Sequence, residues 1–252
     1  MEQFLKVRRG RTNIQMKKII LSYSVFFITV LASSAQTVDE IVTKHLNARG
    51  GVEKMRGIKT VAMQNILAAQ GMEFENKTMV VVGKAMRSES KIMGNDMIQA
   101  FDGVTAWAIM PTMMGGTGEP QEMPAEMMKG VASQTDPFPF LDFATKGNKI
   151  DLINTEIVKG KDAYHLKITS KDGTESETWI GVENGLIAKI KASQNGQEQE
   201  MFFSNYKEFE GLNFPMSMEM ENPMAGTITI ETKSIVINGV IDEAIFKMPG
   251  KK

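Results

Sequence analysis

Residues 162–181 read DAYHLKITSKDGTESETWIG, and the pattern of this stretch recurs through most of the chain. Tyr164, Leu166 and Ile168 are apolar, the residues between them are polar, and a Lys-Asp-Gly turn follows at 171–173. A period of two indicates a strand with one apolar face, as in an antiparallel sheet that is wet on one side. The stretch therefore predicts two antiparallel strands joined by a tight turn.

Runs with the same strand-like composition lie on both sides of this stretch, between turn signals. Asp102-Gly103 is the clearest hairpin signal. The predicted strands are 60–69, 72–82, 85–93, 96–101, 104–110, 150–158, 162–170, 174–181, 185–192, 197–206, 212–221, 226–237 and 244–248. About twelve such strands predict a mainly β (α+β) protein whose large, strongly curved sheet has helices over its apolar face or encloses a cavity.

Three segments have helical patterns. Thr37 and Glu40 form a capping box at the start of a helix that Gly50-Gly51 ends, and a shorter helix is expected at 52–56. Between the two groups of strands, residues 111–146 form an insertion. Its parts 122–132 and 138–145 are expected to be helical.

The N-terminus has the features of a secretory signal. Basic residues precede an apolar run from Ile19 to Leu31, and small residues end at Ala35. The run is too short to span a bilayer, which needs about 20 residues. Residues 1–35 are therefore expected to be a cleaved leader, and Met16 is an alternative start. Residues 36–252 are expected to be one soluble, unanchored domain outside the cytoplasm.

Composition excludes several classes of function. The chain has no cysteine, and therefore no disulfide, thiol nucleophile or cysteine-ligated metal. Without the leader, 23 basic and 29 acidic residues remain, so the net charge is about −6. A nucleic-acid-binding protein shows the opposite bias. We expect no nucleic-acid partner.

No motif indicates catalysis or a resident cofactor or metal. The only histidines, His45 and His165, are expected on a helix face and on the polar face of a strand. Gly115–Gly118 lacks the Lys-Ser/Thr pair that holds a phosphate. The carboxylates are not paired by any spacing, so a two-carboxylate hydrolase is a disfavoured alternative. We expect the protein not to be an enzyme.

Methionine is unusually frequent, with 21 residues. Thioethers are soft Cu(I) ligands, but alternate residues of a strand lie about 7 Å apart, in a line rather than around one ion. Unbranched methionines also suit core filling or an adaptable apolar pocket under a helical lid. The candidate pocket and lid residues are Trp107, Met110, Met123, Met127, Phe138, Phe140, Phe143, Met216, Met218 and Met220.

The order of elements resembles that of LolA/LolB-like outer membrane lipoprotein-sorting proteins. The resemblance rests on residues 100–107 with their Asp-Gly hairpin, on the helical insertion, and on the ending at 241–249. It implies an incomplete antiparallel β-barrel, or half-barrel, covered by an N-terminal helix and a helical lid. It also implies a cavity for acyl chains, with Arg87 as a latch that holds the lid through backbone carbonyls.

The resemblance implies a periplasmic carrier or binder of acylated lipoprotein or lipid, between an inner-membrane donor and an outer-membrane acceptor. The long glycine- and methionine-rich loop at 111–120 departs from the carrier pattern and leaves the ligand open. An acyl-sensing regulatory module of the cell envelope is the main alternative. A hydrolase and a Cu(I) carrier rank below it.

Overall fold

The structure is a computed structural model that describes residues 36–194, 197–222 and 226–250. The predicted leader, residues 1–35, lies outside the described residues, and so does Met224. The chain from Thr37 onward forms one compact unit.

Helix α2 (Val38–Ala48) has the predicted capping box at its start. The Glu40 amide donates to the Thr37 hydroxyl at 3.3 Å, and the Thr37 amide donates to the Glu40 carboxylate at 2.9 Å. Gly50 ends the helix with a φ of +120°, and a Cβ there would lie 2.2 Å from the Gly211 carbonyl oxygen. Only glycine fits this close approach. Helix α3 (Val52–Arg56) follows at once.

The thirteen strands of the described chain form one antiparallel sheet in the order β6-β5-β4-β3-β2-β1-β13-β12-β11-β10-β9-β8-β7. Neighbours in this order are consecutive along the chain except for β1 and β13, and the sheet remains open because β6 and β7 are its edges. The bounds are β1 Thr60–Ala69, β2 Met72–Val81, β3 Ala85–Ile92, β4 Asn95–Phe101, β5 Ala106–Ile109, β6 Gln121–Glu122, β7 Lys149–Val158, β8 Lys161–Thr169, β9 Glu175–Gly181, β10 Ile187–Gln194, β11 Gln197–Phe209, β12 Leu212–Asn222 and β13 Gly226–Ile237.

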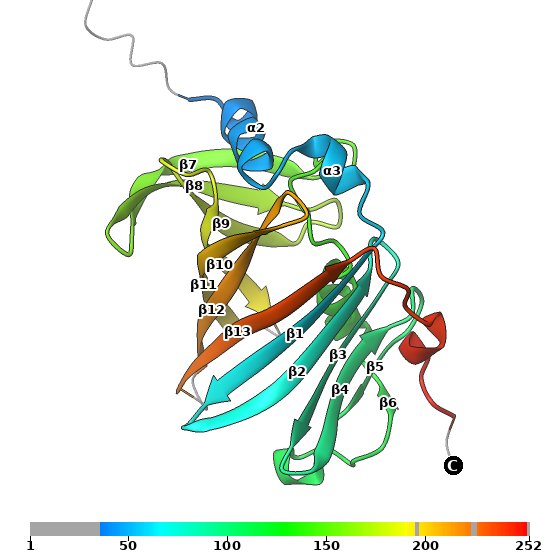
Figure 1. Ribbon diagram of the computed structural model, residues 1–252. Coiled ribbons are helices and arrows are strands. Elements are labelled where there is room, and N and C mark those ends of the chain that lie inside the picture. The colour runs from blue at the N-terminus through cyan, green and yellow to red at the C-terminus, as the bar shows by residue number, and fades with distance from the viewer. Residues whose placement is uncertain (1–35, 195–196, 223–225, 251–252) are drawn as a thin grey trace, which may run out of the picture. The chain divides into compact units, whose positions relative to one another are not determined.

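The sheet divides into two wings at β12 and β13. These strands pair only between Ser217–Asn222 of β12 and Gly226–Glu231 of β13. Before Ser217, β12 pairs only with β11, and after Glu231, β13 pairs only with β1. Lys233 in β13 is an extra residue beside this junction, opposite the step from Gln64 to Asn65 in β1. Such bulges bend a strand and increase its twist. Figure 1 shows the wings diverging toward the end where α2 and α3 lie.

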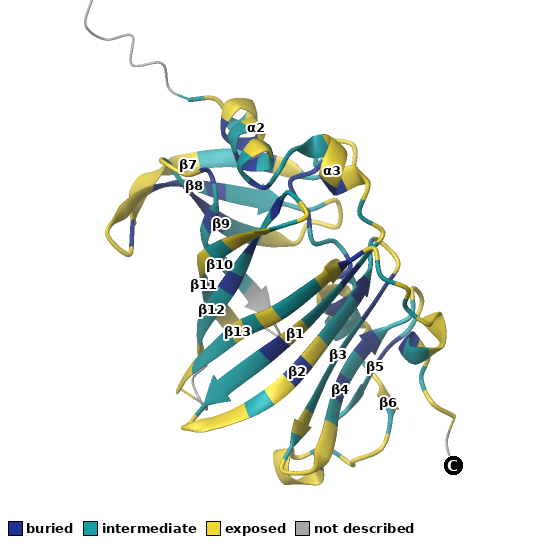
Figure 2. Ribbon diagram, in the orientation of Figure 1, coloured by how far each residue is buried: buried dark blue, intermediate teal, exposed yellow. Residues whose placement is uncertain are grey.

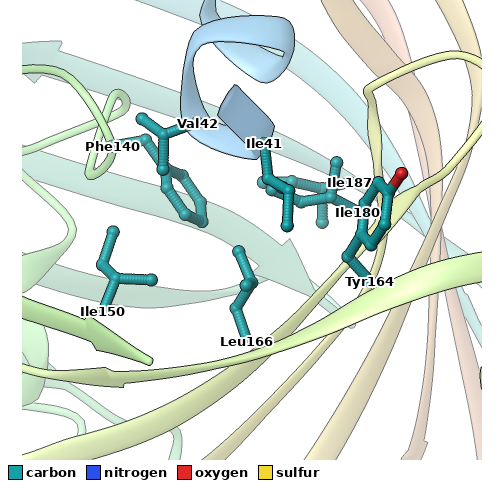
Figure 3. Close-up of a cluster of buried hydrophobic side chains, with 8 residues drawn as sticks. All are labelled: Ile41, Val42, Phe140, Ile150, Tyr164, Leu166, Ile180 and Ile187. Carbon is teal, nitrogen blue, oxygen red and sulfur yellow. The ribbon is translucent and has the colours of Figure 1, made fainter. Parts of the chain in front are cut away.

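One face of the sheet, here called the inner face, carries the helices. Ile41 and Val42 of α2 pack on Leu166 and Ile180, so the alternation in β8 orients its apolar side chains as predicted (Figure 3). Helix α4 (Ala125–Ser133) covers the other wing, where its Val131 packs on side chains of β2, β3 and β5. The architecture is the predicted half-barrel with an N-terminal helix and a helical cover.

Two predicted elements differ in the structure. Residues 138–145 form turns rather than a helix, because Phe138 and Phe140 enter two different apolar clusters and cannot share one helix face. The predicted strand at 244–248 is instead a 3-10 helix, η2 (Glu243–Phe246), whose N-cap Asp242 accepts from the Ala244 amide at 3.0 Å. A further 3-10 helix, η1 (Thr112–Met114), follows β5.

Burial is greatest at the end of the sheet nearest α2 and α3. Met55 of α3 is buried there with Leu212, Phe214 and Ile237, which fill the space between the wings. At the far end the strands are half-buried or exposed (Figure 2). The inner face is therefore closed by side chains at one end and more open at the other.

Candidate functional site

Eight half-buried apolar side chains form a continuous surface on the inner face, here called the apolar floor. They are Leu67, Phe74, Met201, Phe203, Met218, Met220, Ile228 and Ile230. Strand register places them side by side, because residues directly opposite in an antiparallel pair share a face. The pairs are Phe74–Leu67, Leu67–Ile230, Ile230–Met218, Met218–Phe203, Ile228–Met220 and Met220–Met201.

The floor lies between the areas that the helices cover. Helix α2 contacts β7, and α4 contacts β3, β4 and β5, whereas the floor extends over β2, β1, β13, β12 and β11. Its side chains are half-buried, although their face is the one that elsewhere forms the core. A contiguous, incompletely covered apolar surface is typical of a ligand groove or an interaction site.

A buried hydrogen-bond network borders the floor on the β1–β2–β3 side. The side-chain amide of Asn65 donates to the side-chain oxygen of Asn76 at 3.0 Å, and the side-chain oxygen of Asn65 accepts from the Thr232 hydroxyl at 3.0 Å. Asn76 also donates to Ser88 at 2.9 Å and to Ser90 at 3.0 Å. Because these polar groups satisfy one another, the border is polar without leaving an unpaired donor in the interior.

Arg49 lies at the closed end of the floor, where it is the C-cap of α2. Its guanidinium carbon lies over the rings of Phe138 and Phe214, 5.4 and 5.6 Å from the ring centroids, and only 7 % of the residue is exposed. The buried Nε has no hydrogen-bond partner, and no ion pair of the described residues involves Arg49. Burial lowers the pKa of this guanidinium from its usual value.

Burial also affects His45, one turn earlier in α2, and keeps its ring neutral. Burial lowers its pKa to about 4, against the opposing effect of a hydrogen bond between Nδ1 and the Gly185 carbonyl at 2.9 Å. The ring packs edge-on against Phe140 with centroids 4.8 Å apart. His45 therefore fixes α2 to the β9–β10 connection and is a core residue.

A cleft of about 440 Å³ lies where β12 and β13 separate. Its lining is mostly polar and consists of Ser204, Asn205, Lys207, Phe209, Met216, Ser217, Glu231, Thr232 and Lys233. Met216 and Phe209 connect it to the interior, since Phe209 contacts Phe214 edge-on at 6.5 Å. A second, open depression follows the outer side of α2, away from the floor.

Eight of the ten predicted pocket residues separate into three groups. Met218 and Met220 belong to the floor, and Met216 continues their line toward Phe214 as a buried residue. Met123 packs under α4, and Met127 is half-buried on that helix. Phe138, Phe140 and Phe143 fill the closed end, whereas Met110 is 44 % exposed after β5.

Trp107 does not line the inner face. It pairs with Ala100 on the outer face, is fully buried beneath the C-terminal segment, and donates from Nε1 to the Phe246 carbonyl at 2.7 Å. Its neighbour Ala106 is the residue that faces α4. The position of Trp107 follows from the period of two, which puts adjacent residues on opposite faces.

Arg87 binds a backbone carbonyl, but one of the C-terminal segment rather than of the α4 cover. Its Nη1 donates to the Ile245 carbonyl at 2.9 Å, and its Nε donates to Glu89 at 2.8 Å. The guanidinium also lies over the Trp107 ring at 5.6 Å. Arg87 therefore fastens η2 to the outer face, because β3 directs Met86, and not Arg87, toward α4.

His165 lies on the outer face, as predicted. It stacks on Trp179 with ring centroids 4.1 Å apart, and its Nε2 lies 2.7 Å from a Glu177 oxygen. Within the described residues, no group of three His, Asp or Glu side chains is arranged to hold a metal ion. None of the described helices has the length and apolarity needed to cross a bilayer.

Sequence reasoning missed most of the floor and Arg49. The alternation in β1 and β13 contains the signal for Leu67 and Ile230, but Lys233 shifts the phase of β13 and hides which side faces inward. Arg49 follows a helix and precedes two glycines, where a surface charge is the usual interpretation. Its burial depends on Phe138 and Phe214, which are far away in the sequence.

Comparison with solved structures confirms the resemblance at the level of the fold. An outer membrane lipoprotein-sorting protein domain from Vibrio parahaemolyticus has a TM-score of 0.55 at 13 % identity, over 82 % of this chain and 94 % of that one. A LolA superfamily protein from Nitrosomonas europaea has 0.55 at 13 %, over 84 % and 97 %. A DUF1329 family protein from Desulfovibrio piger has 0.55 at 14 %, over 83 % and 97 %.

Sequence comparison is less informative about activity. No curated protein matches this chain. A family model described as "Uncharacterized protein" matches residues 120–249, from the α4 region to the C-terminal segment and just over half of the chain. The chain belongs to the family that this model describes, and its fold is similar to that of the LolA superfamily protein from Nitrosomonas europaea.

Proposed function

We propose that this protein binds acyl chains of lipoproteins or lipids on its apolar floor and carries them across the periplasm. The observation that carries the proposal is the floor itself, eight apolar side chains on the inner face of an open half-barrel. The fold it shares with a lipoprotein-sorting domain supports the same function. Residues 1–35 would act as the export signal, and the mature protein would be soluble and unanchored.

The chemistry of the floor suits a chain that must bind and then leave. Each buried methylene contributes about 0.8 kcal/mol, so a long acyl chain gains several kcal/mol on the floor. Met201, Met218 and Met220 are unbranched and adapt to chains of different shape. No proton transfer or nucleophile is required, and the protein would act without catalysis, cofactor or metal.

The cover over the chain would come from α4 and the residues around it. Met123 and Met127 are half-buried near one side of the inner face. Phe138, Phe140 and Phe143 hold the closed end in place. Met110, on the exposed loop beyond β5, would contact a chain only after the loop has moved.

The test uses two aspartate variants of one strand. Leu67 belongs to the floor, and its neighbour Ile66 is equally half-buried on the outer face. Native mass spectrometry of the mature protein, incubated separately with a diacylated lipopeptide and with palmitic acid, should show a bound adduct with at least one of them in the wild type and in Ile66→Asp. Leu67→Asp should lose it, because a carboxylate on the floor would be desolvated by the chain.

Absence of any adduct in the wild type would refute the proposal. Equal loss in both variants would also refute it, because the inner face would then have no special part in binding. Deletion of the gene separates transport from acyl sensing. Mislocalised lipoproteins support a carrier, and correct sorting with an altered envelope-stress response supports a sensor.

A further inference from the structure

Within the part of the chain that the structure describes, the guanidinium of Arg49 is a buried cation without a counter-ion. Tyr206, Phe138, Phe214 and His45 surround it, and none of these carries a negative charge. The Tyr206 hydroxyl donates to the Ile187 carbonyl at 2.9 Å, and burial raises its pKa to about 12. Buried charges in proteins are ordinarily paired, so an isolated one indicates a partner outside the chain.

The position of Arg49 relative to the floor defines what that partner is. Phe214, Met216, Met218 and Met220 follow each other at alternate positions of β12, and they therefore lie on one face. Arg49 stacks on the first of them. From Phe214 to Met220 the strand extends about 20 Å, at about 3.3 Å per residue. A cation thus lies at one end of a long apolar track.

We propose that Arg49 binds the anionic oxygen group, carboxylate or phosphate, of an amphiphile whose single acyl chain lies along the floor. This inference rests on the proposed function and names the ligand class more narrowly. It favours an amphiphile that carries a free carboxylate or phosphate over one that carries no acid group.

The guanidinium geometry fits such a group. Its donors form a planar fork that binds a carboxylate or a phosphate through two parallel hydrogen bonds. The unpaired Nε belongs to one edge of this fork. The guanidinium carbon lies over both the Phe138 and the Phe214 ring, and these apolar neighbours offer no hydrogen-bond acceptor, so the N–H groups at its edge are left for a polar contact.

Met216 stands between the guanidinium and the half-buried floor. It is buried on the same face as Phe214 and Met218, and it also lines the cleft between β12 and β13. A methionine side chain has three rotatable bonds and is not branched. Rotation of this one side chain toward the cleft would join Arg49 to the floor without moving a strand.

The experiment compares three probes that share a sixteen-carbon chain: palmitic acid, hexadecanol and palmitoyl lysophosphatidic acid. Their affinities for the mature wild type would be measured by competition with a fluorescent fatty acid. We expect the two acids to bind at least tenfold more tightly than hexadecanol. The acid that binds more tightly shows whether Arg49 prefers a carboxylate or a phosphate.

Arg49→Met keeps an unbranched side chain beside the Phe138 and Phe214 rings, and Lys54→Met removes an exposed cation from nearby α3 as a control. Arg49→Met should reduce both acids to the affinity of hexadecanol, and Lys54→Met should change nothing. Circular dichroism would verify folding, and the wild-type comparison stands even when the variant unfolds. Equal binding of all three probes by the wild type would overturn the Arg49 inference and leave acyl binding intact. Binding of none would overturn the proposed function itself.

Discussion

The buried His45 should make the stability of this protein fall steeply in mild acid. Its pKa is about 4 in the folded protein and near 6.5 in an unfolded chain. Between these values the unfolded chain binds more protons, so acidification favours unfolding. The stabilising contribution is fully present above pH 6.5 and is lost progressively down to about pH 4. The shift corresponds to about 3 kcal/mol in total, of which about 2 kcal/mol is lost by pH 5.

The perturbation that isolates this effect is His45→Gln, because glutamine can still donate to the Gly185 carbonyl and does not titrate. The free energy of unfolding in urea would be measured for both proteins at pH 7.5 and pH 5.0. Carboxylates titrate in both proteins and cancel in the comparison. The wild type should lose about 2 kcal/mol more than the variant. The same loss in both proteins would refute the assignment of His45 as a buried neutral residue.

Three further predictions concern single contacts. Gly50→Ala should destabilise the fold far more than Gly51→Ala, because only at Gly50 does a Cβ meet another backbone, and thermal unfolding of both variants measures the difference. Trp107→Phe leaves the Phe246 carbonyl without its donor, which should cost about 1–3 kcal/mol in urea unfolding and leave acyl-chain affinity unchanged. Arg87→Met should release η2 and make the chain after Asn238 more sensitive to limited proteolysis; unchanged cleavage would contradict its role as a fastener.

Much of the fold could be predicted from local chemistry. The capping box of α2, the approximate positions of the strands from 60 to 237 and the alternation in β8 follow from nearest neighbours in the sequence, and the structure confirms them. The turns at 138–145 could not be predicted in this way, because Phe138 and Phe140 pack into clusters formed by distant strands. Residues 244–248 have a strand-like composition, but Trp107 and Arg87 hold their backbone on the outer face.

The candidate site was less predictable, and for related reasons. Methionines at alternate positions of β12 showed one row of the floor, but the neighbouring rows depend on strand order and on the bulge at Lys233. Arg87 was expected to bind backbone carbonyls, and it does, but on the outer face. The direction of a side chain changes with a register shift of one residue. Arg49 had no local signal, since its burial is entirely tertiary.

The central claim is that the inner face, and not the outer one, receives an acyl chain. The absence of cysteine permits a direct measurement, because Ile230→Cys and Thr229→Cys each introduce one label site on adjacent residues of opposite faces. With an environment-sensitive fluorophore at each site, added palmitoyl lipid should shift the emission of the label at 230 and leave that at 229 unchanged. An equal response at the two sites, or none at 230, would contradict the account.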